Sequence, residues 1–259
     1  MTEPNIFLLL LIGIFIGAAS GYLGSFMVLK RMSLVGDALS HVALPGIAVA
    51  LVFHISPMVG AMTALLVATL GVWYLEQKSS IYPEALVGVF FTASLALGIL
   101  LTPEPELLES LFGSMETITY IDGLMAIWIS IAILVLTKII SRQLVLGAIS
   151  EGLAKSVGIS SKKINLLYLI LVGIVVALGV KYVGTLLMGA LVIIPAVSAK
   201  NISRSMQQYY LFSILFGVVS TVAGTIIAYG YHLTTGPIIV LVNIVIFILT
   251  FLISHLRKK

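Results

Sequence analysis

The stretch from Arg31 to Ala50, RMSLVGDALSHVALPGIAVA, places an acid and a histidine inside a segment that is otherwise as apolar as a membrane span. Asp37 and His41 are four residues apart, so on a helix they share one face, with Ser40 near it. Ionisable side chains at membrane depth are costly and usually face a cavity or a transport path. We predict that Asp37 and His41 line such a path; the alternative is a buried pair that only ties helices together.

Pro45 follows His41 by four residues. Proline has no N–H, and its ring clashes with the carbonyl four residues earlier, which here belongs to His41. The segment therefore predicts one site with a carboxylate, an imidazole and a freed backbone oxygen. A second proline, Pro195, is predicted to interrupt a later span, so both prolines are candidate kinks beside a pore.

The composition is that of a polytopic membrane protein. Of 259 residues, 60% are hydrophobic and 9% are charged, whereas soluble proteins have about 25% charged residues. A spanning helix needs about 20 residues, which leaves room for eight to ten spans and no large extramembrane domain. We therefore predict an all-α, single transmembrane domain over residues 1–259. The absence of cysteine excludes disulfides and thiolate metal sites.

Nine apolar segments are predicted to span the membrane. They lie at about residues 6–29, from the Asp37 stretch to 53, 57–75, 81–101, 123–140, 164–180, 183–199, 209–231 and 237–253. If alternate loops face alternate sides, nearly all Lys and Arg residues fall on or near one side. The positive-inside rule makes that side cytoplasmic, with the N-terminus outside and the C-terminus inside. Eight spans with one re-entrant segment are the alternative.

The predicted outer side carries an acidic stretch between residues 102 and 122. It contains Glu104, Glu106, Glu109, Glu116 and Asp122, without Lys or Arg. Such a stretch would gather cations electrostatically, or it is simply a solvated loop. The net charge of +4 lies in short loops between spans and indicates membrane topology, with no nucleic-acid partner.

The polar segment 141–163 is predicted to face the cytoplasm. Ser150 is placed to cap a short helix from Glu151 to Val157, which Gly158 would close. We predict that this helix, with Gly152 and Lys155, docks a cytoplasmic partner. The alternative is an interfacial helix lying on lipid.

Two predicted spans carry similar proline motifs, ALPG at 43–46 and IIPA at 193–196. In the predicted topology these spans run in opposite directions. Proline-interrupted spans at matching places of two halves are typical of inverted repeats with a site between them. Two kinked helices without any repeat are the alternative.

The chain has no G-x-x-x-x-G-K-[ST] motif, so it does not hydrolyse ATP through a P-loop. A carboxylate and an imidazole suit borderline divalent ions such as Zn²⁺ or Mn²⁺. Two ligands do not close a coordination shell. We expect the remainder to come from water, from the His41 carbonyl or from a second copy of the chain.

The motif R-x-S-L-x-G-D-A-L-S-H-x-x-L-P-G at 31–46 resembles the signature of permease subunits of zinc, manganese and iron ATP-binding-cassette importers. Further matches are SLFG at 110–113, EGLAKSVG at 151–158, VGTLLMGALVIIPA at 183–196 and TGPIIVL at 235–241. The resemblance implies the type II importer fold and a prokaryotic cell membrane location. It also implies a homodimer with the metal path at its centre, in which Asp37 and His41 contact the transported ion.

The same resemblance implies that the chain is a transport subunit, not an enzyme, and needs no resident cofactor. Separate cytoplasmic ATP-binding subunits would dock around Glu151, and an extracellular metal-binding protein would deliver the ion. Two other functions fit the same pattern. One is import of a metal chelate, such as cobalamin or a siderophore, through the same fold; the other is ion-coupled secondary transport by the chain alone.

Overall fold

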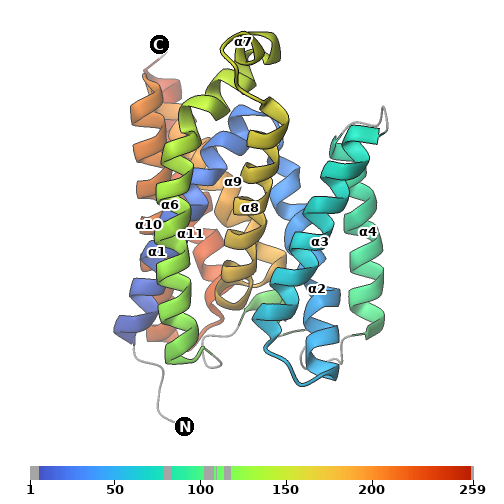
Figure 1. The fold of residues 1–259 in the computed structure, drawn as a ribbon. Helices are drawn as coiled ribbons and strands as arrows, with labels where there is room; N and C mark the ends of the chain where they lie inside the picture. The colour runs from blue at the N-terminus through green and yellow to red at the C-terminus, as the bar shows by residue number, and fades with distance from the viewer. Residues whose placement is uncertain (1–5, 79–82, 102–107, 109, 114–117, 258–259) are drawn as a thin grey trace.

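The structure is a computed structural model that describes residues 6–78, 83–101, 108, 110–113 and 118–257. The described residues form ten α-helices and no strand (Figure 1). The helices are α1 (Ile6–Leu29), α2 (Ser33–Val52), α3 (Pro57–Lys78), α4 (Pro83–Leu101), α6 (Tyr120–Ile149), α7 (Glu151–Ser156), α8 (Ser161–Val183), α9 (Thr185–Ile202), α10 (Met206–Tyr231) and α11 (Thr235–Leu256).

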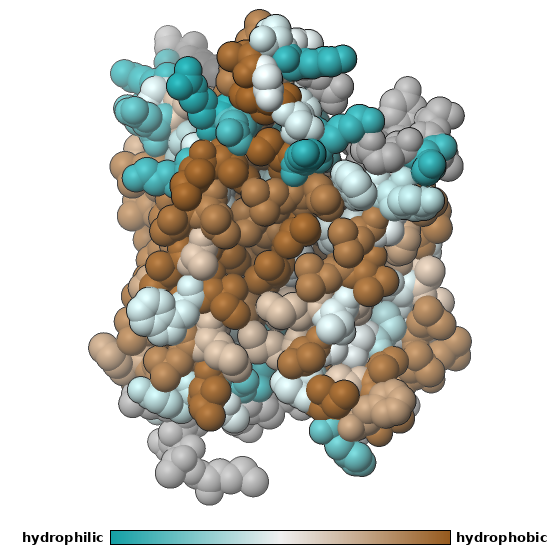
Figure 2. All heavy atoms as spheres, viewed as in Figure 1, coloured by the Kyte–Doolittle hydropathy of each residue, from teal (hydrophilic) through white to brown (hydrophobic). Residues whose placement is uncertain are grey.

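The long helices have the length and composition of membrane spans. Eight of them in the described ranges are long and apolar enough to cross a bilayer, and α4 adds a shorter apolar stretch, Ala85–Leu101, beside α3. Together they correspond one for one to the nine predicted spans. Figure 2 shows the resulting apolar band across the middle of the molecule. Hydrophilic side chains gather at the end that carries α7. Lys30, Arg31, Lys155 and Lys162 lie at this end, so we call it the basic end.

The helix α6 corrects one predicted boundary. It runs for 30 residues, so residues 141–149 continue the helix, although they were assigned to a polar loop. The chain has no proline there, and the helix ends only where Ser150 begins α7. The short helix itself is confirmed: the Ser150 hydroxyl accepts a hydrogen bond from the Leu153 N–H at 3.3 Å. Gly158 follows it in the left-handed region, with φ of 76°.

The prolines do not break their helices. Both α2 and α9 are continuous α-helices through Pro45 and Pro195, so the predicted interruption of the seventh span is wrong. Proline is tolerated in spanning helices because neighbouring helices, hydroxyl side chains and small local adjustments satisfy the backbone groups that it frees. The two proline-containing helices pack against each other. The inverted repeat stays a prediction.

The helix α1 is at the centre of the fold and contacts α6, α8, α9 and α10. Glycines permit this packing, because a Cβ atom at Gly17 would collide with the carbonyl of Gly217 in α10. A Cβ at Gly21 would likewise strike the Ser213 carbonyl, and one at Gly24 the Val192 carbonyl of α9. Small residues at this spacing are what allows spanning helices to approach closely in lipid.

Buried tyrosines of α8 and α10 form hydrogen bonds to the backbone of α1. The hydroxyls of Tyr168 and Tyr182 in α8 donate to the carbonyls of Leu23 and Leu9 in α1, at 2.9 and 3.0 Å. The Tyr209 hydroxyl of α10 donates to the Ser25 carbonyl at 3.0 Å. These bonds tie α8 and α10 to α1 at defined heights, because each hydroxyl has a single buried acceptor carbonyl on α1.

Three of the sequence motifs meet at the end opposite the basic end. Gly113 and Gly184 have φ values of 76° and 96°. A Cβ at either would collide with the backbone of the other's segment, and one at Gly236 would strike the Val183 carbonyl. Only glycine has both the conformation and the size for these positions. The SLFG, VGT and TGP motifs therefore form one glycine joint, from which α9 begins.

The helix directions make a topological prediction. Ser160 and Thr234 are exposed helix N-caps that make no side-chain capping bond, and they lie at opposite ends of the molecule (Figure 1). The chain has no cysteine, so a cysteine introduced at either position would be the only one. We expect a membrane-impermeant thiol reagent to label Thr234→Cys on intact cells and Ser160→Cys only after permeabilisation, because basic ends face the cytoplasm. Labelling of both from one side would contradict the fold.

Candidate functional site

Asp37 and His41 lie one turn apart on α2, as the sequence predicts, where α2 packs against α4 and α9. Asp37 is half-buried, and only 6% of His41 is exposed. The buried Ser40 hydroxyl donates to the backbone carbonyl of Asp37 at 2.6 Å. Ser40 therefore bonds to the backbone of α2, and the carboxylate of Asp37 and the imidazole of His41 remain the candidate functional groups of this segment.

The His41 imidazole packs against an aromatic side chain of α4, and that contact leaves its Nδ1 atom without a hydrogen bond among the described residues. Its ring meets the edge of the Phe91 ring at a centroid distance of 5.0 Å. Its Nδ1 atom is buried and has no hydrogen-bond partner among the described residues. A buried polar atom without a partner is costly. Because a neutral imidazole nitrogen is also a good metal ligand, this atom is available to an ion at the site.

Gly189 of α9 makes room for Asp37. A Cβ atom at Gly189 would lie 2.6 Å from both the Cα and the Oδ1 atoms of Asp37. Any side chain there would push α2 and α9 apart and displace the carboxylate. Sequence reasoning did not assign Gly189 a role; its only signal was its position in the VGTLLMGALVIIPA motif. Phe91 was missed as well, because nothing in the sequence pairs it with His41.

The α2 segment that follows His41 is in close contact with two helices, α4 and α3. A Cβ at Gly98 of α4 would lie 2.7 Å from the Cβ of Leu44, next to Pro45. Gly46 of α2 and Gly60 of α3 are in equally close mutual contact, since a Cβ on either would collide with the carbonyl of the other. Pro45 therefore lies in a rigid three-helix contact that fixes the height of His41.

No third ligand completes the site within the chain as described. Nowhere in the described ranges do three or more His, Asp or Glu side chains come close enough together to hold a metal ion. Glu104, Glu106, Glu109 and Glu116 lie outside the described residues. Asp122, the acidic residue of that stretch that is described, is engaged elsewhere: it forms an ion pair with Lys181 at 2.7 Å and a capping box with Thr119. Asp37 and His41 are thus the two candidate ligands in the described part of one copy of the chain.

The second predicted site, α7, protrudes at the basic end (Figure 1). Gly152, Lys155 and Gly158 are exposed, and so are the apolar side chains of Leu153 and Val157, at 51% and 63%. Ala154 is buried and anchors the helix. A short capped helix that presents apolar and charged residues beyond the membrane band is suited to bind another protein.

The comparisons with known proteins cover almost the whole chain. The ABC 3 transport family model matches residues 3–254. The manganese import system permease protein ScaB of Streptococcus gordonii is 32% identical over 96% of this chain and 93% of its own. The high-affinity zinc uptake system membrane protein ZnuB of Haemophilus influenzae is 30% identical over 93% of this chain and 94% of its own.

The fold agrees with that of a solved relative. The structure of PsaBC from Streptococcus pneumoniae in complex with Fab matches 94% of this chain and 89% of that chain, with a TM-score of 0.83 and 31% identity. A match of this extent in sequence and in fold confirms the resemblance carried by the Asp37–His41 motif. The chain belongs to the ABC 3 transport family.

Proposed function

We propose that this chain is the permease subunit of an ATP-driven importer of divalent transition-metal ions, with manganese, zinc or iron as the cargo. The observation that carries the proposal is the Asp37–His41 pair on one face of α2. It combines a half-buried carboxylate with a buried imidazole nitrogen that has no hydrogen-bond partner among the described residues. The names of the manganese and zinc relatives support the same cargo class. In a chain without cysteine, these oxygen and nitrogen ligands favour Mn²⁺ and Zn²⁺ over a soft ion such as Cu⁺.

The incomplete ligand set suits transport. An ion must bind strongly enough to lose part of its hydration shell and weakly enough to leave again. The negative charge of Asp37 offsets the lost hydration, and His41 adds a neutral ligand. Both must be deprotonated to bind the ion.

The remaining ligands are proposed to come from a second copy of the chain. Two-fold symmetric dimers are the commonest assemblies, and a symmetry axis near α2 would duplicate Asp37 and His41 around one ion. Four protein ligands would then surround the path. A tetrahedral Zn²⁺ site needs four ligands in total, and a larger shell for Mn²⁺ would add water.

The energy would come from separate ATP-binding subunits that dock on α7, because the chain contains no P-loop. The exposed Leu153 and Val157 side chains give that contact its apolar area. An extracellular metal-binding protein would deliver the ion to the end opposite the basic end. We place the C-terminus in the cytoplasm and the N-terminus outside, in a prokaryotic cell membrane.

The first prediction of the transport proposal concerns the two candidate ligands. Asp37→Asn keeps the shape of the side chain but removes its charge, and His41→Ala removes the imidazole. Each is expected to lower metal uptake at least tenfold, since one lost ligand of this kind costs more than about 1.4 kcal/mol. Uptake of radioactive Mn²⁺ and Zn²⁺ would be measured in cells at matched expression. A variant that transports at the wild-type rate would make Asp37 and His41 a structural pair.

The second prediction concerns Gly189. Gly189→Ala places a methyl group against the Asp37 backbone and carboxylate, so uptake is expected to fall severalfold while the chain still inserts. Gly88→Ala is the matched control, because a Cβ at this helical glycine meets nothing within 4 Å. Thermal unfolding of both purified variants would accompany the uptake assay. Equal uptake by the two would show that Gly189 does not position Asp37.

The third prediction concerns coupling. Glu151→Lys reverses a charge on α7 and is expected to weaken association with the ATP-binding subunits, because charge reversal at a contact rim slows binding. Gly152→Trp adds bulk beside it and should act in the same way. Co-purification of the ATPase and metal uptake would both be measured, with Gln207→Lys, exposed outside α7, as control. Normal uptake by both α7 variants would remove the docking role.

A further inference from the structure

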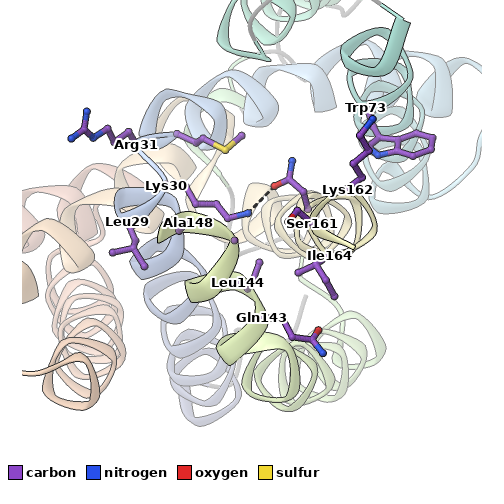
Figure 3. Close-up of a pocket in the computed structure, with 13 residues that line it drawn as sticks. Leu29, Lys30, Arg31, Trp73, Gln143, Leu144, Ala148, Ser161, Lys162 and Ile164 are labelled. Atoms are coloured by element: carbon purple, nitrogen blue, oxygen red, sulfur yellow. Dashed lines mark hydrogen bonds between the residues drawn. The ribbon is translucent and has the colours of Figure 1, made fainter. Parts of the chain in front are cut away.

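A cavity of about 580 Å³ opens at the basic end, between the ends of α1, α3, α6 and α8 (Figure 3). It is separate from the Asp37–His41 site and from α7, although the last residues of α6 form one wall. Its size is within the range of about 300–1,000 Å³ usual for ligand pockets. Nothing in the proposed transport function uses it.

The cavity is strongly positive. Lys30, Arg31 and Lys162 all line it, and no Asp or Glu is found among its described lining residues. Lys30 is held in place, because it donates to Asn165 Oδ1 at 2.8 Å and lies 5.1 Å from the centre of the Tyr168 ring. Arg31 and Lys162 form no ion pair with any residue that the structure describes. Two of the three cations therefore have no counter-charge within the part of the chain that the structure describes.

The backbone of the α1–α2 turn contributes to this arrangement. Arg31 has φ of 61°, in the left-handed region that residues other than glycine rarely adopt. In Figure 3 its side chain extends outward, away from the Lys30–Asn165 hydrogen bond. Strained backbone of this kind is often found at ligand sites. The turn thus directs the Lys30 ammonium group into the cavity, whereas Arg31 lines the cavity and extends its side chain away from it.

Neutral donors complete the lining. Ser161 is the first residue of α8, whose N-cap, Ser160, makes no side-chain capping bond. Free N–H groups and the positive end of the helix dipole at this position favour an anion. The buried indole Nε1 of Trp73, also in the lining, has no hydrogen-bond partner among the described residues.

The other walls are apolar, formed by Leu29, Met32, Leu144 and Ile164. This site combines cations and N–H donors with an indole and apolar walls. Such a combination is typical of proteins at the level of the lipid head groups. Basic pockets between spanning helices on the cytoplasmic side are known to bind anionic lipid head groups, and tryptophan is enriched at that level.

We propose that this cavity binds a phosphate group, carried by an anionic phospholipid or free in the cytoplasm. Lys30 and Lys162 supply positive charge to the cavity, Arg31 adds charge at the adjacent turn, and Ser161 supplies a neutral donor. The apolar walls favour the lipid as the source, because free phosphate would gain nothing from them. Binding here requires neither Asp37 nor His41, so the site stands independently of the transport proposal.

The test uses the purified full-length chain in a neutral detergent. Binding of dihexanoyl phosphatidylglycerol, dihexanoyl phosphatidylcholine and inorganic phosphate would be titrated by calorimetry. We expect phosphatidylglycerol to bind more tightly than phosphatidylcholine. Arg31→Ala with Lys162→Ala should weaken that binding about 25-fold, at about fivefold per lost charge. Lys163→Ala with Arg204→Ala, two exposed cations outside the cavity, should change it less than twofold.

Each remaining outcome decides the proposal. Binding of phosphatidylglycerol but not of phosphate assigns the site to lipid, whereas phosphate binding with the same dependence on Arg31 and Lys162 assigns it to a soluble source. Absence of binding by both probes, or an equal loss in the two double variants, overturns it. It is also overturned if the Arg31/Lys162 variant binds both probes normally but no longer co-purifies with the ATPase, because the cavity would then receive an acidic side chain of that partner.

Discussion

The close approach of helix backbones at glycine is the contact on which the rest of this structure depends. Lipid tails are as apolar as leucine, so burial of apolar side chains does not by itself hold spanning helices together. Packing at short range must do so, and α1 achieves it where Gly17 meets Gly217 and Gly21 meets Ser213. The tyrosine hydroxyls of α8 and α10 then bond to the α1 backbone, which fixes the heights of the surrounding helices.

The same short-range packing places the functional pair. Gly189 lets α9 approach Asp37, Gly98 lets α4 approach the turn after His41, and Gly46 lets α3 close the third side. The glycine joint at Gly184, from which α9 begins, sets the height at which Gly189 meets Asp37. A carboxylate and an imidazole at membrane depth are energetically costly, and closely packed neighbouring helices hold both side chains in the arrangement that the proposed ion path requires.

The two ends of the molecule differ in their chemistry. At the basic end, Lys30, Arg31 and Lys162 gather around one cavity, and α7 presents exposed Leu153 and Val157 beyond the membrane band. At the opposite end, the described acid Asp122 is neutralised by Lys181. By the positive-inside rule, this asymmetry favours an orientation with the basic end in the cytoplasm. The proposed phosphate and ATPase contacts would then lie on one side of the membrane and the proposed ion entry on the other.

The sequence alone determined the all-helical membrane architecture, the positions of the nine long apolar helices, the capped helix after Ser150 and the one-turn spacing of Asp37 and His41. Eight of those nine helices are long enough to span a bilayer. These features follow from hydropathy, capping and helical spacing, which are local properties. It was wrong about the end of α6 and about an interruption at Pro195, since whether a helix continues depends on what packs against it. Only the tertiary structure showed that Gly189 faces Asp37, that Phe91 faces His41 and that three separated cations share one cavity. These are contacts between helices distant in the chain, and no local pattern encodes which faces of two helices meet.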